Sequence, residues 1–487
     1  MLLALFLLNL FIIYITITSF KYFWNRRRLH KLASQIPGHN GLPIVGILPK
    51  YLKIDKKEFF SSTFDMMDPN ATLTKIWVGP KLMLLTEDPD VIHTVFNSTN
   101  CINKPDIFYH ALTVINGLLP LSGPRYLEHR RILNKSFMLT TLQKIQPIIE
   151  AKCNRMIKKL EGNVNKELDI MDFVGACALE SFGEAQFGYS SDLYGFEGHK
   201  IIKESLEFGL DRVTQPWLHY LPEFIFKMTE INKKIDKVIS FCIKYKAKVT
   251  ETYNQKKVED YDSVKHRVID VLLNPENNLS DIEIRDELMM FTIGSYDTTA
   301  KTVSFLIFLT AMHPDVQSKL IDEIDSICGT EDNLALTIEF FKKFEYMEMV
   351  IKETMRLFPV GPSVARTNDA EIEIGGFLIP KDSIFLMSLM RMHRNPKYWG
   401  HDAHLFKPER FAGELRNSRS FAPFTGGKRL CIGYRYANMF MKTLLISFFR
   451  SYQVKTSIKF EDIKLVMGIT LVMDPDCLVT VEKRNKS

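Results

Sequence analysis

The sequence predicts a mainly α-helical protein with a small β-sheet region. Helical periodicity dominates from about Leu142 to Cys328, where apolar residues recur at three- and four-residue spacings and Lys or Glu occupies the opposite face. Short strand-like runs lie on both sides of this helical stretch. Because strands and helices do not alternate regularly, the pattern does not favour a dinucleotide-binding fold.

The composition is that of a large globular protein. The chain has 487 residues, 46% of them hydrophobic, and a formal net charge of +6 from 63 basic and 57 acidic side chains. This surplus is too small to favour nucleic-acid binding. The seven cysteines are scattered and form no C-x-x-C pair, so we predict neither a disulfide framework nor a zinc site, and we favour a reducing compartment.

The N-terminal segment, residues 1–20, carries no charged side chain. A helix of about 20 residues spans about 30 Å, the thickness of a bilayer core. Basic residues follow from Lys21 to Lys31 and none precedes them, which predicts a single-pass anchor with the remaining chain in the cytosol. A cleaved signal peptide is the alternative, but the segment lacks a basic start and a small-residue cleavage site. The cytosolic placement predicts no glycans on the sequons at Asn70, Asn97 and Asn134.

A stiff hinge is predicted after the basic run. The segment Ile36–Gly46 contains two prolines and three glycines, which favours a non-helical linker, although a plain surface loop is the alternative. We therefore predict three parts: the anchor at 1–20, a basic stop-transfer segment and hinge at 21–46, and one large domain at 47–487.

The first strands are predicted around a turn at Gly79-Pro80. Leu73–Val78 and Lys81–Leu85 flank this turn in the pattern of a β-hairpin. Asp88-Pro89 then predicts a helix start, with proline in the first turn. Further strands are predicted at Glu371–Ile379, Ser383–Met387 and Ile469–Val472.

A long helix is predicted between Ser280 and Pro314. Ser280 and Glu283 form a capping-box pattern, and Pro314 ends the helix. The roughly thirty residues between them span about 45 Å at 1.5 Å per residue.

The middle of this helix carries an acid beside an alcohol, Asp297 and Thr298. Thr298 can donate its hydroxyl to the carbonyl of Gly294 one turn back, which would open the helix locally. An acid–alcohol pair at such an opening could form a proton relay. The alternative is a kinked core helix in which hydroxyl groups bond back to the main chain.

The most specific motif is Phe424-Thr-Gly-Gly-Lys-Arg-Leu-Cys431-Ile-Gly433. Its paired glycines permit a tight turn or the close approach of a flat ligand. Cys431 is predicted at the N-terminus of a helix running from Ile432 to about Tyr452, where the helix dipole favours a thiolate. A thiolate held by backbone N–H groups is an electron-rich ligand of the kind that binds haem iron. A buried cysteine in a Gly-rich turn is the alternative.

The string Phe-x-x-Gly-x-Arg-x-Cys-x-Gly resembles the haem-binding signature of the cytochrome P-450 family of haem-thiolate monooxygenases. The resemblance covers nearly the whole chain, with the motifs in the expected order, and is closest to the microsomal branch that contains fatty-acid omega-hydroxylases. It implies the cytochrome P-450 fold, in which a long oxygen-binding helix and a Cys-ligand loop lie on opposite faces of the haem. It also implies that Cys431 is the proximal iron ligand in a haem-containing catalytic domain.

The same resemblance implies roles for further residues. Asp297 and Thr298 match the acid–alcohol pair of the oxygen-binding helix, whereas Ser295 replaces its usual second glycine. Gly294 stands where many members of the branch have a glutamate that esterifies the haem, so we expect haem b to be non-covalent apart from the Cys431–iron bond. Further haem contacts are implied for Phe424, Gly427, Gly433, Gly294, the propionate-binding candidates Arg429, Arg366 and Arg130, and Tyr126, which replaces the usual tryptophan.

Two more motifs resemble the family pattern. Glu353-Thr-Met-Arg356 matches its Glu-x-x-Arg helix, and Arg410 belongs to a Pro-Glu-Arg-Phe segment. We expect Glu353, Arg356 and Arg410 to form a structural lock that holds the Cys431 loop. As a surface pair, Glu353 and Arg356 would contribute only about 0–1 kcal/mol.

The resemblance implies a monooxygenase of the endoplasmic reticulum membrane. It would insert one oxygen atom from O2 into a lipophilic substrate, by hydroxylation or epoxidation, with electrons from NADPH delivered by NADPH–cytochrome reductase, and cytochrome b5 is a second candidate donor. The alternatives are a haem-thiolate isomerase or dehydratase and a non-catalytic haem-binding protein. The intact Asp297-Thr298 pair argues against the isomerase.

Two surfaces are assigned by position in the family pattern. The expected substrate-lining segments are mostly apolar, which favours a lipophilic substrate; they are Phe108 to Leu121, Ile293 with Gly294, Val360 to Val364, and Gly468 to Leu471. The basic side chains expected to face an acidic electron donor are Lys428, Arg435, Lys442 and Lys135.

Overall fold

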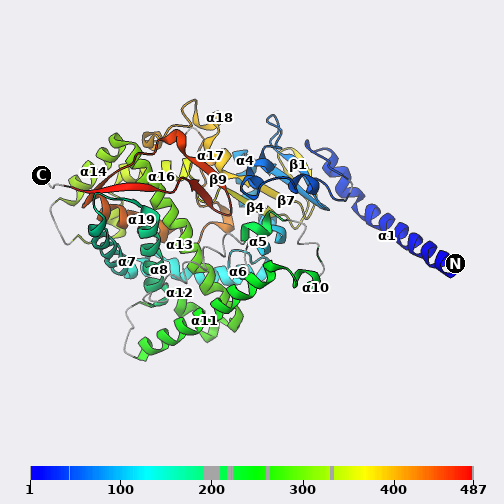
Figure 1. The fold of residues 1–487 in the computed structure, drawn as a ribbon, viewed down its shortest axis with the longest axis horizontal. Helices are drawn as coiled ribbons and strands as arrows, with labels where there is room; N and C mark the ends of the chain where they lie inside the picture. The colour runs from blue at the N-terminus through cyan, green and yellow to red at the C-terminus, as the bar shows by residue number, and fades with distance from the viewer. Residues whose placement is uncertain are drawn as a thin grey trace.

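The computed structural model describes residues 2–42, 44–112, 115–189, 209–215, 221, 223–258, 264–329, 334–415 and 417–484. Helices pack around the long helix α13 (Asp281–Met312), and a four-stranded sheet lies on the side from which α1 (Leu2–Ser34) extends (Figure 1). The predicted fold class, mainly helical with a small amount of sheet, is therefore confirmed.

The remaining α-helices of the described residues differ widely in length. They are α2 (Leu48–Tyr51), α3 (Phe59–Phe64), α4 (Pro89–Asn97), α5 (Asp106–Leu112), α6 (Gly123–Leu133), α7 (Leu139–Leu160), α8 (Ile170–Phe187), α10 (Glu223–Phe226), α11 (Glu230–Val258), α12 (Val268–Leu272), α14 (Pro314–Cys328), α15 (Ile338–Phe341), α16 (Glu345–Leu357), α17 (Leu389–Arg394), α18 (Pro396–Trp399) and α19 (Tyr434–Phe449).

The central helix α13 begins and ends where the sequence predicts. The Ser280 Oγ accepts a hydrogen bond from the Glu283 N–H at 3.3 Å, and the Glu283 carboxylate accepts one from the Ser280 N–H at 2.8 Å. The helix packs against α8, α11, α16 and α19. At its contact with α8, a Cβ added to Gly175 would lie 3.0 Å from the Tyr296 ring, so the two helices approach closely there.

The main sheet has the strand order β1-β2-β7-β4. β1 (Thr74–Val78) and β2 (Lys81–Thr86) form the predicted antiparallel hairpin. β7 (Ile384–Ser388) is parallel to β2 and antiparallel to β4 (Ser363–Thr367). The sequence prediction includes β7 but not β4, which contains the charged residue Arg366.

The other sheets are small. The predicted strand at Glu371–Ile379 is a hairpin of β5 (Ile372–Ile374) and β6 (Phe377–Ile379), because Gly375 and Gly376 turn the chain at φ +62° and +81°. β9 (Lys464–Met467) pairs with β10 (Leu471–Asp474). β11 (Leu478–Lys483) lies between β3 (Glu167–Asp169) and β8 (Tyr452–Lys455).

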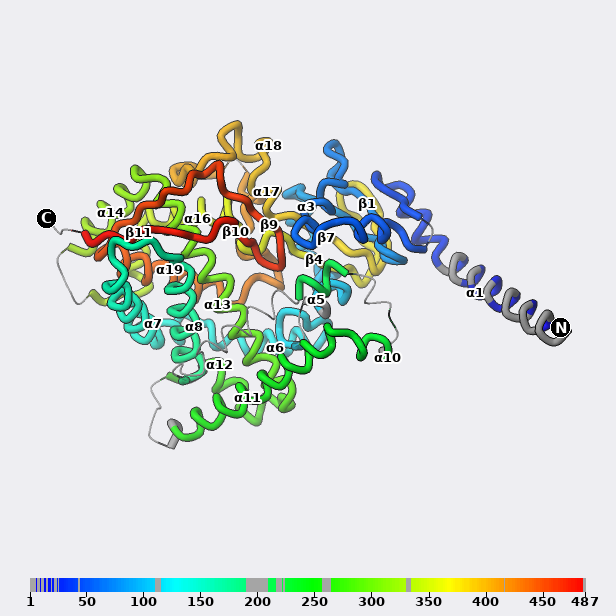
Figure 2. The backbone as a smooth tube through the Cα atoms, viewed as in Figure 1, coloured from blue at the N-terminus to red at the C-terminus, as the bar shows by residue number. Residues whose placement is uncertain are grey.

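The N-terminal helix α1 continues through the basic cluster and ends beside the main sheet (Figure 2). There Arg28 pairs with Glu371 at 2.6 Å, and the His30 ring stacks on Trp77 at 4.8 Å. Among the described residues, no helix combines the length and the apolar character needed to cross a membrane.

The segment predicted as a hinge runs along β1. Gly38 bridges to Lys75 and Gly46 bridges to Val78. Gly46 has φ +59°, and a Cβ there would lie 1.9 Å from the Trp77 carbonyl oxygen. Main-chain pairing therefore fixes the path of this segment, and only glycine fits at position 46.

Replacing Ser280 with alanine should destabilise the N-terminus of α13. The variant loses the side-chain acceptor for the Glu283 N–H, which typically costs about 1 kcal/mol. We expect a lower midpoint in urea unfolding followed by circular dichroism, whereas Ser280→Thr, which keeps the acceptor, should remain close to wild type. Equal midpoints for the alanine variant and the wild type would contradict the assignment of this cap.

Candidate functional site

The Cys431 loop is shaped by its close contact with α4. A Cβ added to Gly427 would lie 1.9 Å from the Phe96 carbonyl oxygen, and Gly427 has φ +62°, so this position requires glycine. Thr425 also has a positive φ of 63°, a strained conformation for a β-branched residue. The Cys431 N–H donates to the Phe424 carbonyl at 3.0 Å and closes the loop.

The helix after Cys431 begins later than predicted. α19 starts at Tyr434 with Gly433 as its N-cap and ends at Phe449, rather than running from Ile432 to about Tyr452. The half-buried Phe424 ring lies 6.2 Å from the Tyr434 ring. Cys431 therefore precedes the first turn of α19 and is not part of it.

Cys431 is exposed, whereas the other six cysteines are buried. Even so, burial by the surrounding protein raises the pKa of the Cys431 thiol, and the Gly433 N–H and the Arg130 charge offset only part of this effect. The expectation that the helix dipole alone favours a thiolate is thus not met, because the helix starts late and desolvation dominates. A coordinated metal ion would supply the charge needed for ionisation.

A short stripe of α13 is also accessible. Gly294 and Thr298 are exposed, although their neighbours Tyr296 and Asp297 are buried. The Thr298 hydroxyl donates to the Gly294 carbonyl at 2.7 Å, as predicted, and a Cβ added to Gly294 would have no neighbour within 4 Å. The Ser295 hydroxyl donates to the Thr292 carbonyl of its own helix at 3.1 Å. The central helix therefore presents an open face at Gly294 and Thr298.

The buried Asp297 has one paired and one unpaired oxygen. Its Oδ1 lies 2.8 Å from the Lys301 Nζ, whereas its buried Oδ2 has no hydrogen-bond partner among the described residues. Sequence reasoning missed Lys301, although an acid and a lysine four residues apart on a helix are a recognisable signal.

The predicted lock residues lie together. The buried Arg356 donates from Nε and Nη2 to the two Glu353 carboxylate oxygens at 2.7 and 2.8 Å. The Arg410 Nε donates to Glu353 Oε1 at 3.0 Å. Arg356 also donates to three main-chain carbonyls, those of His393, Ala403 and Leu405.

His393 links this lock to the Cys431 loop. Its carbonyl accepts from Arg356, and its ring Nε2 accepts from the Ala422 N–H at 3.0 Å, two residues before Phe424. Burial, reinforced by the Arg356 charge, lowers the pKa of His393 to about 3. The ring is therefore neutral at physiological pH, as an acceptor for a backbone N–H must be.

Three buried cations lie near one another without a carboxylate partner in the described part of the chain. They are Lys104, Arg366 and Arg429. Burial and then mutual repulsion lower the pKa of Lys104 well below its ordinary value, and burial lowers the pKa of Arg366. For Arg429, burial and the repulsion of Arg366 lower the pKa to about 10. The Arg366 Nη2 has no partner among the described residues, so this cluster is suited to an added anion.

The sequence identified two members of this cluster but missed Lys104. The Lys104 Nζ donates to the Tyr109 hydroxyl at 2.8 Å. No pattern distinguishes this lysine from a surface lysine, because only the tertiary fold buries it. Arg130 is partly buried, and its charge lowers the pKa of both Cys431 and Arg429.

Arg429 and Tyr126 also support the loop itself. The Arg429 guanidinium lies 3.3 Å from the centroid of the Tyr126 ring, and the Tyr126 hydroxyl donates to the Lys428 carbonyl at 2.7 Å. The structure thus gives the single O–H of Tyr126 an acceptor in the protein, whereas the family resemblance implied a haem contact. Arg429 donates to the main-chain carbonyls of Ile102, Leu118 and Leu121.

The structure describes most of the segments that were expected to line the substrate site. The Leu471 N–H donates to the Val360 carbonyl at 2.9 Å, which brings two predicted lining segments together. Within the predicted segment from Phe108 to Leu121, Thr113 and Val114 lie outside the described residues.

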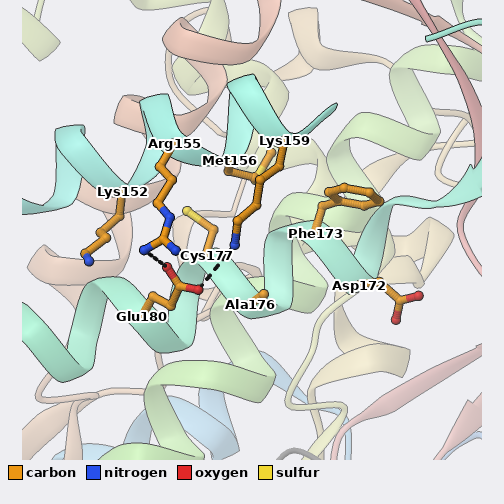
Figure 3. A pocket seen from close by; sticks show the side chains of 9 residues that line it. All are labelled: Lys152, Arg155, Met156, Lys159, Asp172, Phe173, Ala176, Cys177 and Glu180. Atoms are coloured by element: carbon orange, nitrogen blue, oxygen red, sulfur yellow. Dashed lines mark hydrogen bonds and ion pairs between the residues drawn. The ribbon is translucent and has the colours of Figure 1, made fainter. Parts of the chain in front are cut away.

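A separate pocket of about 230 Å³ lies between α7 and α8 (Figure 3). Arg155 and Lys159 of α7 reach toward Glu180 of α8, at 3.6 and 3.4 Å. None of its lining residues belongs to the predicted site, and its cations already have carboxylate partners, so we assign it no role in the chemistry.

The donor set fits a haem. An accessible cysteine on a rigid loop can ligate iron, the open Gly294 face leaves room for a flat ring, and the buried cations can neutralise two propionates. The fold and the site together define a haem-thiolate protein.

Comparison with known proteins identifies the family. A sequence profile of the Cytochrome P450 family matches residues 36–476, and the chain belongs to this family. It is 29% identical to "Probable cytochrome P450 313b1" of Drosophila melanogaster, over 95% of this chain and 97% of that protein. It is 27% identical to "Cytochrome P450 4V2" of Homo sapiens, over 89% of this chain and 87% of that protein.

Family membership establishes the general activity. The protein is a haem-thiolate monooxygenase that inserts one oxygen atom from O2 into an organic substrate, and its cofactor is haem b, with NADPH acting through a reductase. The predicted family, fold, activity and cofactor are confirmed.

Replacing Arg356 with alanine should abolish haem retention. The change removes one of the two guanidinium partners of the buried Glu353 carboxylate, and breaking a buried pair typically costs about 3–5 kcal/mol. The measurement is the ratio of haem to protein after purification. As a control, Lys342→Ala removes an exposed pair with Glu339 at the same three-residue spacing and should leave the ratio unchanged. A normal haem content in the Arg356 variant would refute the lock.

Proposed function

We propose that Cys431 is the proximal ligand of the haem iron and that the haem is otherwise non-covalent. The observation that carries this proposal is an accessible, desolvated cysteine together with a cluster of buried cations that have no carboxylate partner among the described residues. Arg366, Arg429, Lys104 and Arg130 supply the positive charge for the propionates. Gly294 has no side chain with which to form an ester bond to the haem.

A haem held by a thiolate supplies the activation of dioxygen for insertion into a C–H or C=C bond. The side chains of α13 handle the protons. The partnerless Oδ2 of Asp297 can receive a proton and pass it toward the open face. The Thr298 oxygen can accept a hydrogen bond there, because its own proton is donated to the Gly294 carbonyl at 2.7 Å.

The substrate class is lipophilic. The Val360–Leu471 contact brings together apolar segments that can hold a substrate through area burial rather than through ion pairs. The absence of a glutamate at position 294 removes one reason to assume fatty-acid substrates.

The electron donor is NADPH–cytochrome reductase, with cytochrome b5 as a second candidate. Lys428, Arg435 and Lys135 are exposed and can face an acidic donor. Lys442 is a weaker candidate, because its ammonium pairs with Glu348 at 2.7 Å.

The cellular location is the endoplasmic reticulum membrane, with a single N-terminal anchor and a cytosolic catalytic domain. The support is the uncharged segment at residues 1–20 and the basic cluster that follows it.

Cys431→Ala should abolish both the thiolate-type ferrous–CO absorption band and turnover. The test uses full-length protein reconstituted with the reductase and NADPH, and mass spectrometry of a panel of lipophilic substrates. Cys328→Ala, at a buried cysteine on α14, should retain both readouts. A thiolate-type band in the Cys431 variant would refute the ligand assignment. Turnover of hydroperoxides without NADPH or reductase, and no oxygenation with them, would instead favour an isomerase or dehydratase.

Deleting residues 1–20 should make the protein extractable from membranes by alkaline carbonate, because the uncharged segment is lost. The full-length protein should resist this treatment and should carry no glycan on its sequons. Extraction of the full-length protein, or a mobility shift on glycosidase treatment, would contradict the proposed anchor and topology.

A further inference from the structure

Lys301 connects the acid of the central helix to the substrate side of the molecule. Its Nζ lies 2.8 Å from Asp297 Oδ1 and donates to the Thr470 hydroxyl at 2.7 Å. The Lys301 side chain is 18% exposed and that of Asp297 is 6% exposed, so the pair is largely withdrawn from solvent. Lys301 is thus fixed at two points that are far apart in the sequence.

Thr470 belongs to the turn between β9 and β10, which touches other parts of the substrate side. The next residue, Leu471, donates its N–H to the Val360 carbonyl at 2.9 Å. A Cβ added to Gly468 in the same turn would lie 3.9 Å from Leu210. The turn therefore contacts elements before and after α13 in the chain.

The ion pair leaves the two oxygens of Asp297 unequal. Oδ1 is held by Lys301, whereas Oδ2 is buried and has no hydrogen-bond partner among the described residues. A buried carboxylate oxygen without a partner is costly, so its presence in a well-packed helix calls for an explanation. An oxygen atom that receives and releases a proton must not be held by a permanent hydrogen-bond partner.

We propose that Lys301 is a positioning residue for proton delivery. It fixes Oδ1 of Asp297, which keeps Oδ2 free, and through Thr470 it ties the carboxylate to the β9–β10 turn. A substrate that contacts this turn therefore acts on the orientation of Asp297. This inference rests on the proposed role of Asp297 and Thr298 in proton delivery.

A purely helix-stabilising pair would look different. Such pairs at four-residue spacing are normally solvated and contribute about 0.3–0.5 kcal/mol. Lys301 instead also donates a hydrogen bond to Thr470, which lies 169 positions away in the sequence. Glu348 and Lys352 provide a matched example of the ordinary kind, with a distance of 3.4 Å and side chains 35% and 38% exposed.

Lys301→Met tests the proposal in the full-length protein reconstituted with the reductase. The variant keeps the aliphatic stem but loses both polar contacts. We expect product formed per NADPH consumed to fall roughly tenfold to a hundredfold, the range for a misplaced catalytic group. Haem content should stay within about twofold, because the polar contacts of Lys301 in the described structure are with Asp297 and Thr470. The solvent isotope effect on turnover should rise as proton delivery becomes limiting.

Three further variants complete the test. Lys301→Arg keeps a cation and should restore most of the coupling, and Thr470→Val keeps the ion pair and should lower coupling in the same direction but less. Lys352→Met removes the matched solvated pair, leaves Glu348 with Lys442, and should behave as wild type.

The Asp297→Asn variant distinguishes the positioning role of Lys301 from the proton-delivery role of Asp297. If this variant is impaired and Lys301→Met has wild-type coupling and isotope effect, the inference about Lys301 is wrong and the proton-delivery role stands. If Asp297→Asn itself matches wild type, the proton-delivery role fails and the inference falls with it. Loss of haem in Lys301→Met, with normal coupling per bound haem, would assign Lys301 a structural role and would also overturn the proposal.

Discussion

The structure depends on one buried charged group, the guanidinium of Arg356. A fully buried cation is tolerated only when its N–H groups are satisfied, and all five of its N–H groups are used by Glu353 and three main-chain carbonyls. Those carbonyls belong to α17 and to the segment before Arg410. One side chain therefore fixes the relative positions of α16, α17 and that segment, and through the His393 ring it reaches the loop that carries Cys431.

The cluster of buried cations shows the opposite arrangement. Within the described residues, Lys104, Arg366 and Arg429 are buried without carboxylate partners, and burial lowers their pKa values. The lock is electrostatically complete in the protein alone, whereas this cluster becomes complete only with an anionic ligand. Under the proposed function, the polypeptide separates the charges that organise the fold from those that would hold the haem propionates.

Sequence reasoning succeeded where a local pattern dictates the geometry. The Ser280 cap and the Thr298–Gly294 hydrogen bond follow from spacing along one helix. The lock residues also lie together, although only their resemblance to known motifs indicated this. Lys104 and the acceptor of the Tyr126 hydroxyl could not be predicted, because both depend on segments that meet only in the folded chain. The late start of α19 at Tyr434 was likewise not predicted.

Unsatisfied polar atoms provide a further guide to function. Buried donors and acceptors are normally paired, because leaving one unpaired costs about 1–3 kcal/mol. In the described part of the chain, Asp297 Oδ2 is such an atom on α13, and Arg366 Nη2 is another in the cation cluster. One lies beside the accessible stripe of the central helix, and the other belongs to the group suited to an anion. Other buried atoms of the described residues are also unpaired, among them Glu287 Oε2 on the same helix. Asp297 Oδ2 and Arg366 Nη2 guide function because they lie where the proposed proton transfer and haem binding would use them.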